Sequence, residues 1–211
     1  MSDLLQGSCA WRAVRLGKVT ASRMGDVVAR TRVGWSAARG HYMAQLLAER
    51  LTGQPQQSYS HAAMQWGLDV EPEARRAYAF EMNLDVTAVG FVPHPTISMS
   101  GASPDGLVGE VGLLEIKCPQ TATHLDIVMG GALPDKYLAQ MQWQMACTGR
   151  AWCDFVSYDP RLSAALRLII RRVARDEVQI AALREDVVAF LGELDARLAS
   201  LASHIRLIAA A

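Results

Sequence analysis

Two charged side chains, Glu115 and Lys117, interrupt the otherwise apolar run of residues 113–118. A short apolar run bounded by Gly and Pro is typical of a buried strand. Residues two apart in a strand share a face, so Glu115 and Lys117 project together while Leu114 and Ile116 point into the core. A carboxylate is almost never fully buried unless it is paired or liganded. The run therefore predicts a central strand that carries a polar site.

The elements expected around this strand alternate between two periods. Apolar residues at helical spacing predict helices that begin at Thr20 or Ser22, cover 36–51, 61–82, 121–129 and 134–147, and continue from 175 to the end. Pro72 is expected to restart or kink the third of them. Short apolar runs predict strands of a meander at 86–92, 97–100, 107–108, 113–118, 151–158 and 166–173. The pattern predicts an α/β protein with a central mixed β-sheet flanked by helices.

The last helix carries a heptad seam. Its apolar residues are spaced 4, 3, 4, 3, 4, 3 at Val187, Leu191, Leu194, Leu198, Leu201, Ile205 and Ile208. Packing onto the protein's own sheet is the favoured interpretation, and a subunit contact is the alternative.

Composition bounds the class of protein. A chain of 211 residues with 51% hydrophobic and 20% charged residues predicts one globular domain, 1–211, made of a helical part (1–82), a sheet core (83–174) and a C-terminal helix (175–211). The formal charge of +0 excludes an overall basic field, so a polyanion must meet a local patch. Four Cys without a CxxC motif fit a reducing cytosol, and no apolar run suffices for a membrane span.

The chemistry expected at the polar strand is that of a hard cation. Asp105 lies at the end of the preceding hairpin strand and can reach the same point as Glu115. Oxygen ligands of this kind suit Mg²⁺ or Mn²⁺ rather than zinc. Lys117 beside the metal can orient a water or stabilise negative charge on phosphorus. The alternative is a solvent-facing Glu–Lys pair on an edge strand.

Pro104-Asp105, nine intervening residues and Glu115-Ile116-Lys117 match the PD-(D/E)xK nuclease pattern, and this motif falls within a series of six blocks along the chain. These are residues 11–22 (WRAVRLGKVTAS), Trp66-Gly67 with Glu71, residues 103–106 (SPDG), residues 114–119 (LEIKCP), residues 137–142 (YLAQMQ) and residues 158–161 (YDPR). In this order the blocks resemble the phage lambda exonuclease family of viral recombination nucleases, over roughly residues 9 to 200.

The resemblance implies a restriction-endonuclease-like core and a Mg²⁺-dependent exonuclease that degrades one strand of duplex DNA from its 5′ end. It further implies two metal ions, a ring-shaped homotrimer, double-stranded DNA ends as substrate and a single-strand annealing protein as partner. A phage- or prophage-encoded protein in the bacterial cytoplasm is the corresponding localisation.

The resemblance also implies roles for particular residues. Asp105, Glu115, the carbonyl of Ile116 and Glu71 are the expected metal ligands, Lys117 is the expected catalytic lysine, and Gln140 is expected to help position the nucleophile. Arg15, Ser22 and Ser103 are the expected phosphate-binding residues, with Arg15 at the 5′-terminal phosphate. A guanidinium and a helix N-terminus are both suited to bind phosphate. A ring would gather Arg12, Arg15, Arg23, Arg30 and Arg32 on its inner surface.

Several alternatives stay open at this point. Glu71 can simply start a helix, Gln140 and Gln142 can bond strand ends, and Arg15 can be a surface base. A nuclease of the same fold with an iron–sulfur cluster is the second enzymatic hypothesis, because Cys118, Cys147 and Cys153 follow the Glu-x-Lys pair. A non-catalytic DNA-binding module is the third.

Overall fold

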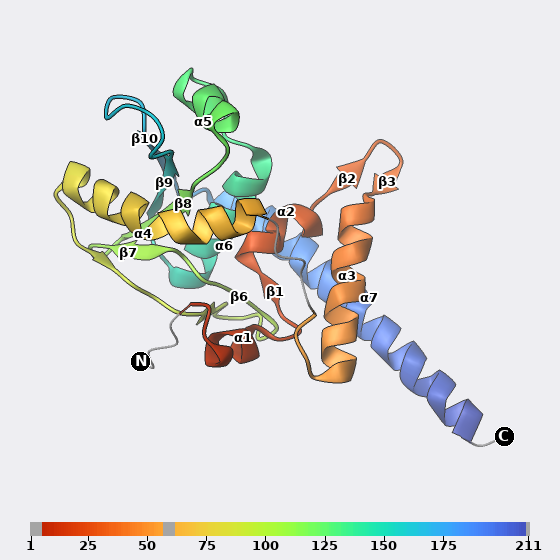
Figure 1. The fold of residues 1–211 in the computed structure, drawn as a ribbon. Coiled ribbons are helices and arrows are strands. Elements are labelled where there is room, and N and C mark those ends of the chain that lie inside the picture. The colour runs from red at the N-terminus through yellow and green to blue at the C-terminus, as the bar shows by residue number, and fades with distance from the viewer. Residues whose placement is uncertain (1–5, 57–61, 210–211) are drawn as a thin grey trace.

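A computed structural model describes residues 6–56 and 62–209, with the side chains at 62–64 and 205–209 outside the description (Figure 1). The helices are α1 (Cys9–Arg15), the 3₁₀ helix η1 (Ala21–Arg23), α2 (Met24–Val27), α3 (Ala37–Thr52), α4 (Ala62–Met82), α5 (Thr121–Val128), α6 (Asp135–Thr148) and α7 (Glu177–Ala209). The strands are β1 (Val19–Thr20), β2 (Arg30–Thr31), β3 (Gly34–Trp35), β4 (Val86–Thr87), β5 (Val92–Pro93), β6 (Ser100–Ala102), β7 (Gly106–Val108), β8 (Gly112–Lys117), β9 (Trp152–Tyr158) and β10 (Leu168–Ala174).

The main sheet has five strands in the order β10-β9-β8-β7-β4. Strand β8 is antiparallel to β7 and parallel to β9, with Glu115 opposite Phe155, and the remaining pairs are antiparallel. A parallel pair needs a long crossover, which here contains α5 and α6. The expected mixed sheet flanked by helices is confirmed, and β8 is its central strand.

The sequence pattern had predicted one meander, but the remaining strands form two separate sheets. Strand β6 pairs with β1 in parallel and with β5 antiparallel, forming a separate three-stranded sheet, and β2 and β3 form a small hairpin. A Cβ at Gly101 in β6 would overlap the ring of Phe91. Because Gly101 has no side chain, the ring of Phe91 can lie directly against this second sheet. The spacing of apolar residues does not reveal such a contact.

Helices cover both faces of the main sheet. Leu114 and Ile116 pack with Tyr78 of α4, whereas Leu113 packs with Met141 and Met145 of α6. Residues 112–116 of β8 are all buried. The face of β8 that carries Glu115 is therefore as enclosed as the face that carries Leu114, because α6 lies over it.

Helix α7 packs on helices rather than on the sheet, which corrects the expected arrangement. It contacts α2, α3 and α6, and Phe190 stacks on Tyr42 with ring centroids 5.6 Å apart. Val187, Leu191 and Leu194 of the seam are buried, whereas Leu201 is 38% exposed. Figure 1 shows the C-terminal part of α7 extending beyond α3. Ile205 and Ile208 lie outside the described side chains.

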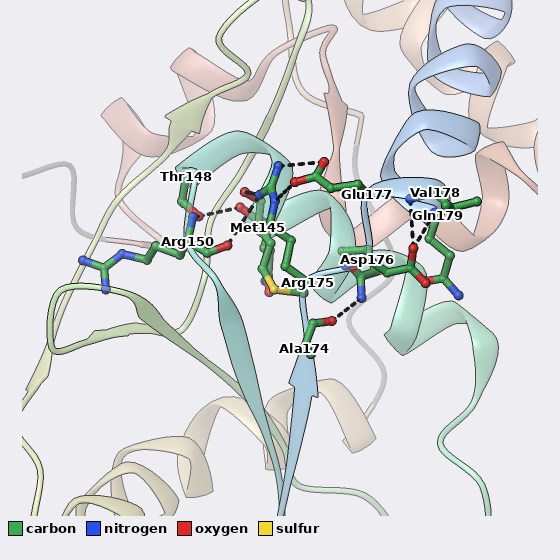
Figure 2. A network of polar contacts seen from close by, with 11 residues as sticks. Met145, Thr148, Arg150, Ala174, Arg175, Asp176, Glu177, Val178 and Gln179 are labelled. Atoms are coloured by element: carbon green, nitrogen blue, oxygen red, sulfur yellow. Dashed lines mark hydrogen bonds and ion pairs between the residues drawn. The ribbon is translucent and has the colours of Figure 1, made fainter.

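Polar contacts fix the start of α7 (Figure 2). Oδ1 of Asp176 accepts the backbone N–H groups of Val178 and Gln179 at 2.9 and 3.0 Å and so caps the helix. Arg175 donates to the carbonyl of Met145 at 2.5 Å. The amide of buried Gln142 donates to the carbonyl of Ala174 at 2.8 Å, as expected for a residue that bonds a strand end.

Two local expectations were met only in part. The helix expected over 61–82 is α4, which continues through Pro72 as one element and does not restart there. Leu68, whose carbonyl loses its helix donor at Pro72, is 61% exposed, so water can satisfy that oxygen. In place of one helix from Thr20 or Ser22, the chain forms β1, η1 and α2 in succession, and neither hydroxyl caps η1 or α2.

Within the described ranges, no helix combines the length and the apolarity needed to cross a bilayer.

Candidate active site

Glu115 is the centre of the candidate site. Its side chain is 1% exposed, yet both carboxylate oxygens have partners. Gln140 donates to Oε1 and Gln144 donates to Oε2, each at 2.6 Å, and Nζ of Lys117 also contacts Oε1. Burial of a carboxylate is tolerated when it is paired and hydrogen-bonded in this way. The structure thus brings the expected residues Glu115, Lys117 and Gln140 into direct contact.

Asp105 adjoins this group from the turn before β7. Its Oδ2 accepts the backbone N–H of Ile116 at 2.6 Å, and its own N–H donates to the carbonyl of Leu114 at 3.1 Å. These two bonds fix Asp105 against the strand residues on either side of Glu115. The expected convergence of the two acids is therefore present.

Glu71 reaches the site from α4 through an arginine. Arg75 donates to Oε1 of Glu71 at 2.7 Å and also to the backbone carbonyl of Asp105. The two residues are one helical turn apart, a spacing that favours such a pair. Glu71 is thereby held beside Asp105, while its carboxylate is engaged by the guanidinium.

A cleft of about 330 Å³ opens at this point. Its walls include Glu71 and Leu68 of α4, residues 116–119 at the end of β8, and Tyr137 of α6. The ring of Tyr137 lies 5.2 Å from Nζ of Lys117 and 5.0 Å from Nζ of Lys136. Two of the three lysines of the chain thus stand beside one aromatic wall of the cleft.

The acids and the lysine perturb one another. Burial, followed by the negative charge of Glu115, raises the pKa of Asp105 well above its usual range. Burial alone would lower the pKa of Lys117, but the carboxylates of Glu115 and Asp105 outweigh it and raise that pKa. Burial raises the pKa of Cys118, next along the chain, to about 12, so this thiol is neutral. The site has an excess of negative charge that a cation would relieve.

The donor chemistry fits a hard divalent cation. Asp105, Glu115, Glu71 and the carbonyl of Ile116 supply only oxygen atoms. In the described part of the chain, no three Asp, Glu, His or Cys side chains form a group that could hold an ion by themselves. A cation at this point would need the two acids and the backbone carbonyl, and Glu71 could join them only after release from Arg75.

Short contacts connect the residues expected to bind phosphate. The guanidinium of Arg15 stacks on Trp11 at 3.8 Å from the ring centroid, and the indole N–H of Trp11 donates to Oγ of Ser103 at 3.0 Å. Ser103 is two residues before Asp105, so this group adjoins the acids. Burial lowers the pKa of Arg15 to about 10, which leaves it charged at neutral pH. Ser22 is exposed, with its hydroxyl 3.4 Å from that of Thr20, whose backbone N–H donates to the hydroxyl of Tyr42 near Arg15.

The expected patch of N-terminal arginines is partly neutralised. Arg23 pairs with Asp26 at 2.5 Å, and Arg30 pairs with Asp186 of α7 at 2.9 Å. Because each of these two arginines is paired with an acid, they carry less free positive charge than the sequence suggested.

Two residues at the site were missed by sequence reasoning, Gln144 and Arg75. A sequence signal existed for each. Gln144 follows Gln140 by one helical turn and so lies on the same face of α6, and Arg75 follows Glu71 at the same spacing.

The fold and this arrangement of acids, lysine and glutamines define a nuclease class, in which a mixed sheet presents a PD-(D/E)xK site at the end of its central strand. The model of the YqaJ-like viral recombinase domain matches residues 10–151, so the chain belongs to that family, and the resemblance to lambda exonuclease is confirmed.

Solved structures agree with this assignment. An alkaline exonuclease, LHK-Exo, from Laribacter hongkongensis is 48% identical over 95% of this chain and 100% of its own, with a TM-score of 0.89. LHK-Exo in complex with dAMP gives 49% identity, the same coverage and a TM-score of 0.90. A phage-related exonuclease from Haemophilus somnus 129PT shares the fold at 16% identity over 87% of this chain and 96% of its own, with a TM-score of 0.66. No functionally curated protein matches the chain.

Proposed function

We propose that this protein is a metal-dependent 5′→3′ exonuclease that degrades one strand of linear double-stranded DNA and leaves a 3′ single-stranded overhang for phage-type recombination. The observation that carries the proposal is the buried carboxylate of Glu115, held by two glutamines beside Lys117 and Asp105 at an open cleft. The similarity to an alkaline exonuclease over the whole of that chain supports the same activity.

Asp105, Glu115, the carbonyl of Ile116 and Glu71 would hold two Mg²⁺ ions, for which Mn²⁺ would substitute. Such cations, when bound, supply Lewis-acid stabilisation of the charge that develops on the phosphate. Lys117, whose ammonium stays protonated because of the neighbouring acids, adds positive charge at the scissile phosphate. Gln140 and Gln144 keep the carboxylate of Glu115 in one orientation, so that its oxygens are fixed before the substrate arrives.

We assign the 5′ end of the substrate strand to Arg15 and Ser103. Arg15 would grip the 5′-terminal phosphate, with Ser103 as a second contact, since Trp11 joins the two residues. Ser22 remains a proposed phosphate ligand that DNA would have to approach from the exposed side of η1.

The alternative with an iron–sulfur cluster is disfavoured by where the cysteines lie. Cys147 belongs to the core between α3, α6 and α7, Cys153 to the core between the sheet and α6, and Cys9 is exposed on α1. Cys118 stands at the cleft. Cluster ligation requires several thiolates around one point, and these four side chains occupy four different environments.

We further propose that residues 1–211 act as one domain, that three copies form a ring around DNA, and that a single-strand annealing protein takes up the overhang in the cytoplasm of a bacterial host. A chain of formal charge +0 has no overall basic field to hold DNA, whereas a ring would retain DNA by encircling it. Light scattering should then give three times the chain mass of 23.0 kDa.

The decisive experiment is digestion of linear duplex DNA with and without a 5′ phosphate, in Mg²⁺ and in EDTA. Cleavage that needs Mg²⁺ and favours the phosphorylated end is expected. DNA binding without any cleavage would favour the non-catalytic module, and equal attack on circular duplex would favour an endonuclease of the same fold.

A further inference from the structure

A second hollow, which we call the Trp66 pocket, lies next to the catalytic cleft. It has a volume of about 320 Å³ and is lined by Trp66, Cys118, Pro119, Gln120 and Arg161. Cys118 and Pro119 also line the cleft that holds Glu71 and Lys117. The two hollows are therefore neighbours that share these two lining residues.

Arg161 forms a pre-positioned flat wall of this pocket. Its Nε and Nη2 donate to Oδ1 and Oδ2 of Asp159 at 2.7 and 2.9 Å. Asp159 is fully buried and is itself fixed by the hydroxyl of Thr121 at 2.6 Å. A bidentate pair of this kind holds the guanidinium in one plane. The Cζ atom of Arg161 lies 4.6 Å from the ring centroid of Trp66, and the arginine side chain is still 47% exposed.

The lining restricts what the pocket can bind. It has no carboxylate, so a cationic ligand would find no counter-charge, and its volume is at the lower end for small-molecule sites. Indole rings and guanidinium planes are the surfaces on which proteins stack unpaired nucleobases. The amide of Gln120 offers a donor and an acceptor to the edge of such a ring.

We propose that the Trp66 pocket binds a nucleobase whose own 5′-phosphate lies in the adjacent cleft beside Lys117. Because the 5′-terminal phosphate is assigned to Arg15 and the scissile phosphate to Lys117, this base belongs to the second nucleotide of the strand being degraded, which becomes the new 5′ end after cleavage and then resembles a nucleoside 5′-monophosphate. Stacking is tolerant of base identity, as degradation of any sequence requires. This inference rests on the proposed exonuclease function and adds a base-binding subsite to it.

The chain provides a matched control for Arg161. Arg172 donates to Oδ1 and Oδ2 of fully buried Asp154 at 2.8 and 2.9 Å and lies 3.6 Å from the ring centroid of Trp152. Asp154 has a further donor in the hydroxyl of Tyr78 at 2.7 Å, as Asp159 has in Thr121. Arg172 is 48% exposed, but it lines neither hollow. The two arginines thus have nearly the same structural role and differ in their proximity to the site.

Calorimetry with two probes in Mg²⁺ tests the pocket without cleavage. The probes are dAMP and 2-deoxyribose 5-phosphate, which lacks the base. Wild-type protein should bind dAMP at least about tenfold more tightly, the order expected for one stacked base. Trp66→Ala and Arg161→Ala should bring the two affinities together, whereas Arg172→Ala should preserve the difference.

Conservative variants separate stacking from folding. Trp66→Phe keeps an aromatic platform and should stay within about threefold of wild type for dAMP, and Arg161→Lys keeps the charge but loses the planar contact and should not. Thermal melting of each variant checks that it is folded. An unaltered preference for dAMP in folded Trp66→Ala or Arg161→Ala, or an equal loss in Arg172→Ala, would overturn the proposal.

Kinetics identify which nucleotide supplies the base. An abasic residue at the second position from the 5′ end should raise KM for wild type and have little effect on Arg161→Ala. An abasic residue at the first position should affect the two proteins alike, and an equal effect of both positions on wild type would overturn the assignment to the second nucleotide. A protein that binds dAMP in this manner but cleaves no DNA would refute the exonuclease function and leave the pocket in place.

Discussion

Gln144 donates its side-chain amide to Oε2 of Glu115 at 2.6 Å, and Gln140, one turn earlier on α6, donates to Oε1 at the same distance. The carboxylate of Glu115 is thus fixed at both oxygens by one helix face. Such supporting contacts orient a metal-binding carboxylate and tune its affinity, even when the supporting residue touches neither metal nor substrate.

Replacement of Gln144 by Leu should lower kcat about 10- to 100-fold, because it leaves one oxygen of Glu115 without its donor. Gln142→Leu is the control, since Gln142 bonds the end of β10 instead. It should reduce stability with little effect on the rate per folded molecule. Equal kinetic losses in both variants would show that α6 contributes only packing.

Removal of either central acid should abolish cleavage and leave the fold intact. Asp105→Asn and Glu115→Gln keep the size of each side chain but lose the charge that a divalent cation requires. Glu110→Gln, on the exposed turn between β7 and β8, is the control. Mg²⁺-dependent digestion by either site variant at a substantial fraction of the wild-type rate would exclude the proposed site.

Replacement of Arg15 by Ala should erase the preference for a 5′-phosphorylated end. A charge-assisted hydrogen bond contributes about 1.5–3 kcal/mol, so the ratio of rates on phosphate and hydroxyl ends should fall by about tenfold or more. Arg12→Ala removes a base from the same helix on its exposed side and should leave that ratio unchanged. The idea fails if Arg15→Ala keeps the wild-type ratio.

Asp159 should make stability depend on pH in the acid range. Its hydrogen bonds from Arg161 lower its pKa from 3.8 to about 2. Because the folded-state pKa is the lower one, the contribution to the free energy of unfolding is complete above about pH 5 and is lost as the pH falls through the folded-state pKa of about 2. With an exposed arginine as partner, we expect about 1–2 kcal/mol. Urea unfolding at several pH values should show a smaller acid loss for Asp159→Asn than for wild type, and identical slopes would contradict this assignment.

The two halves of the seam in α7 should respond differently to charge. Leu194 is fully buried against α3 and α6, so Leu194→Asp should unfold the chain. Leu201 is 38% exposed, so Leu201→Asp should leave a folded protein. If the protruding end joins subunits, the mass measured by light scattering falls in Leu201→Asp. An unchanged mass places the subunit contact elsewhere.

Much of the fold was predictable because the periodicity was strong. The helices at 36–51 and 134–147, and the strand with Glu115, needed only apolar spacing and a glycine after each helix. The second sheet was not predictable, since β1 and β6 are only two and three residues long and lie about 80 residues apart in the chain. Pairing of such short segments depends on tertiary contacts that leave no local pattern.

The site was predictable to a similar extent. The motif located Asp105, Glu115 and Lys117, whereas Gln144 and Arg75 had only a spacing of four residues to mark them. The neutralisation of Arg30 could not have been anticipated, because its partner Asp186 lies 156 residues away.

The parallel pairing of β8 with β9 has a consequence for synthesis of the protein. Both acids and the lysine leave the ribosome before α6, and β9 follows later still, so the central strand lacks its neighbour and Glu115 lacks its two amides until most of the chain exists. A fragment that stops before residue 140 holds the whole motif but has no supported carboxylate to use. A chain terminated before residue 140 is therefore expected to lack nuclease activity, although it contains every residue of the motif.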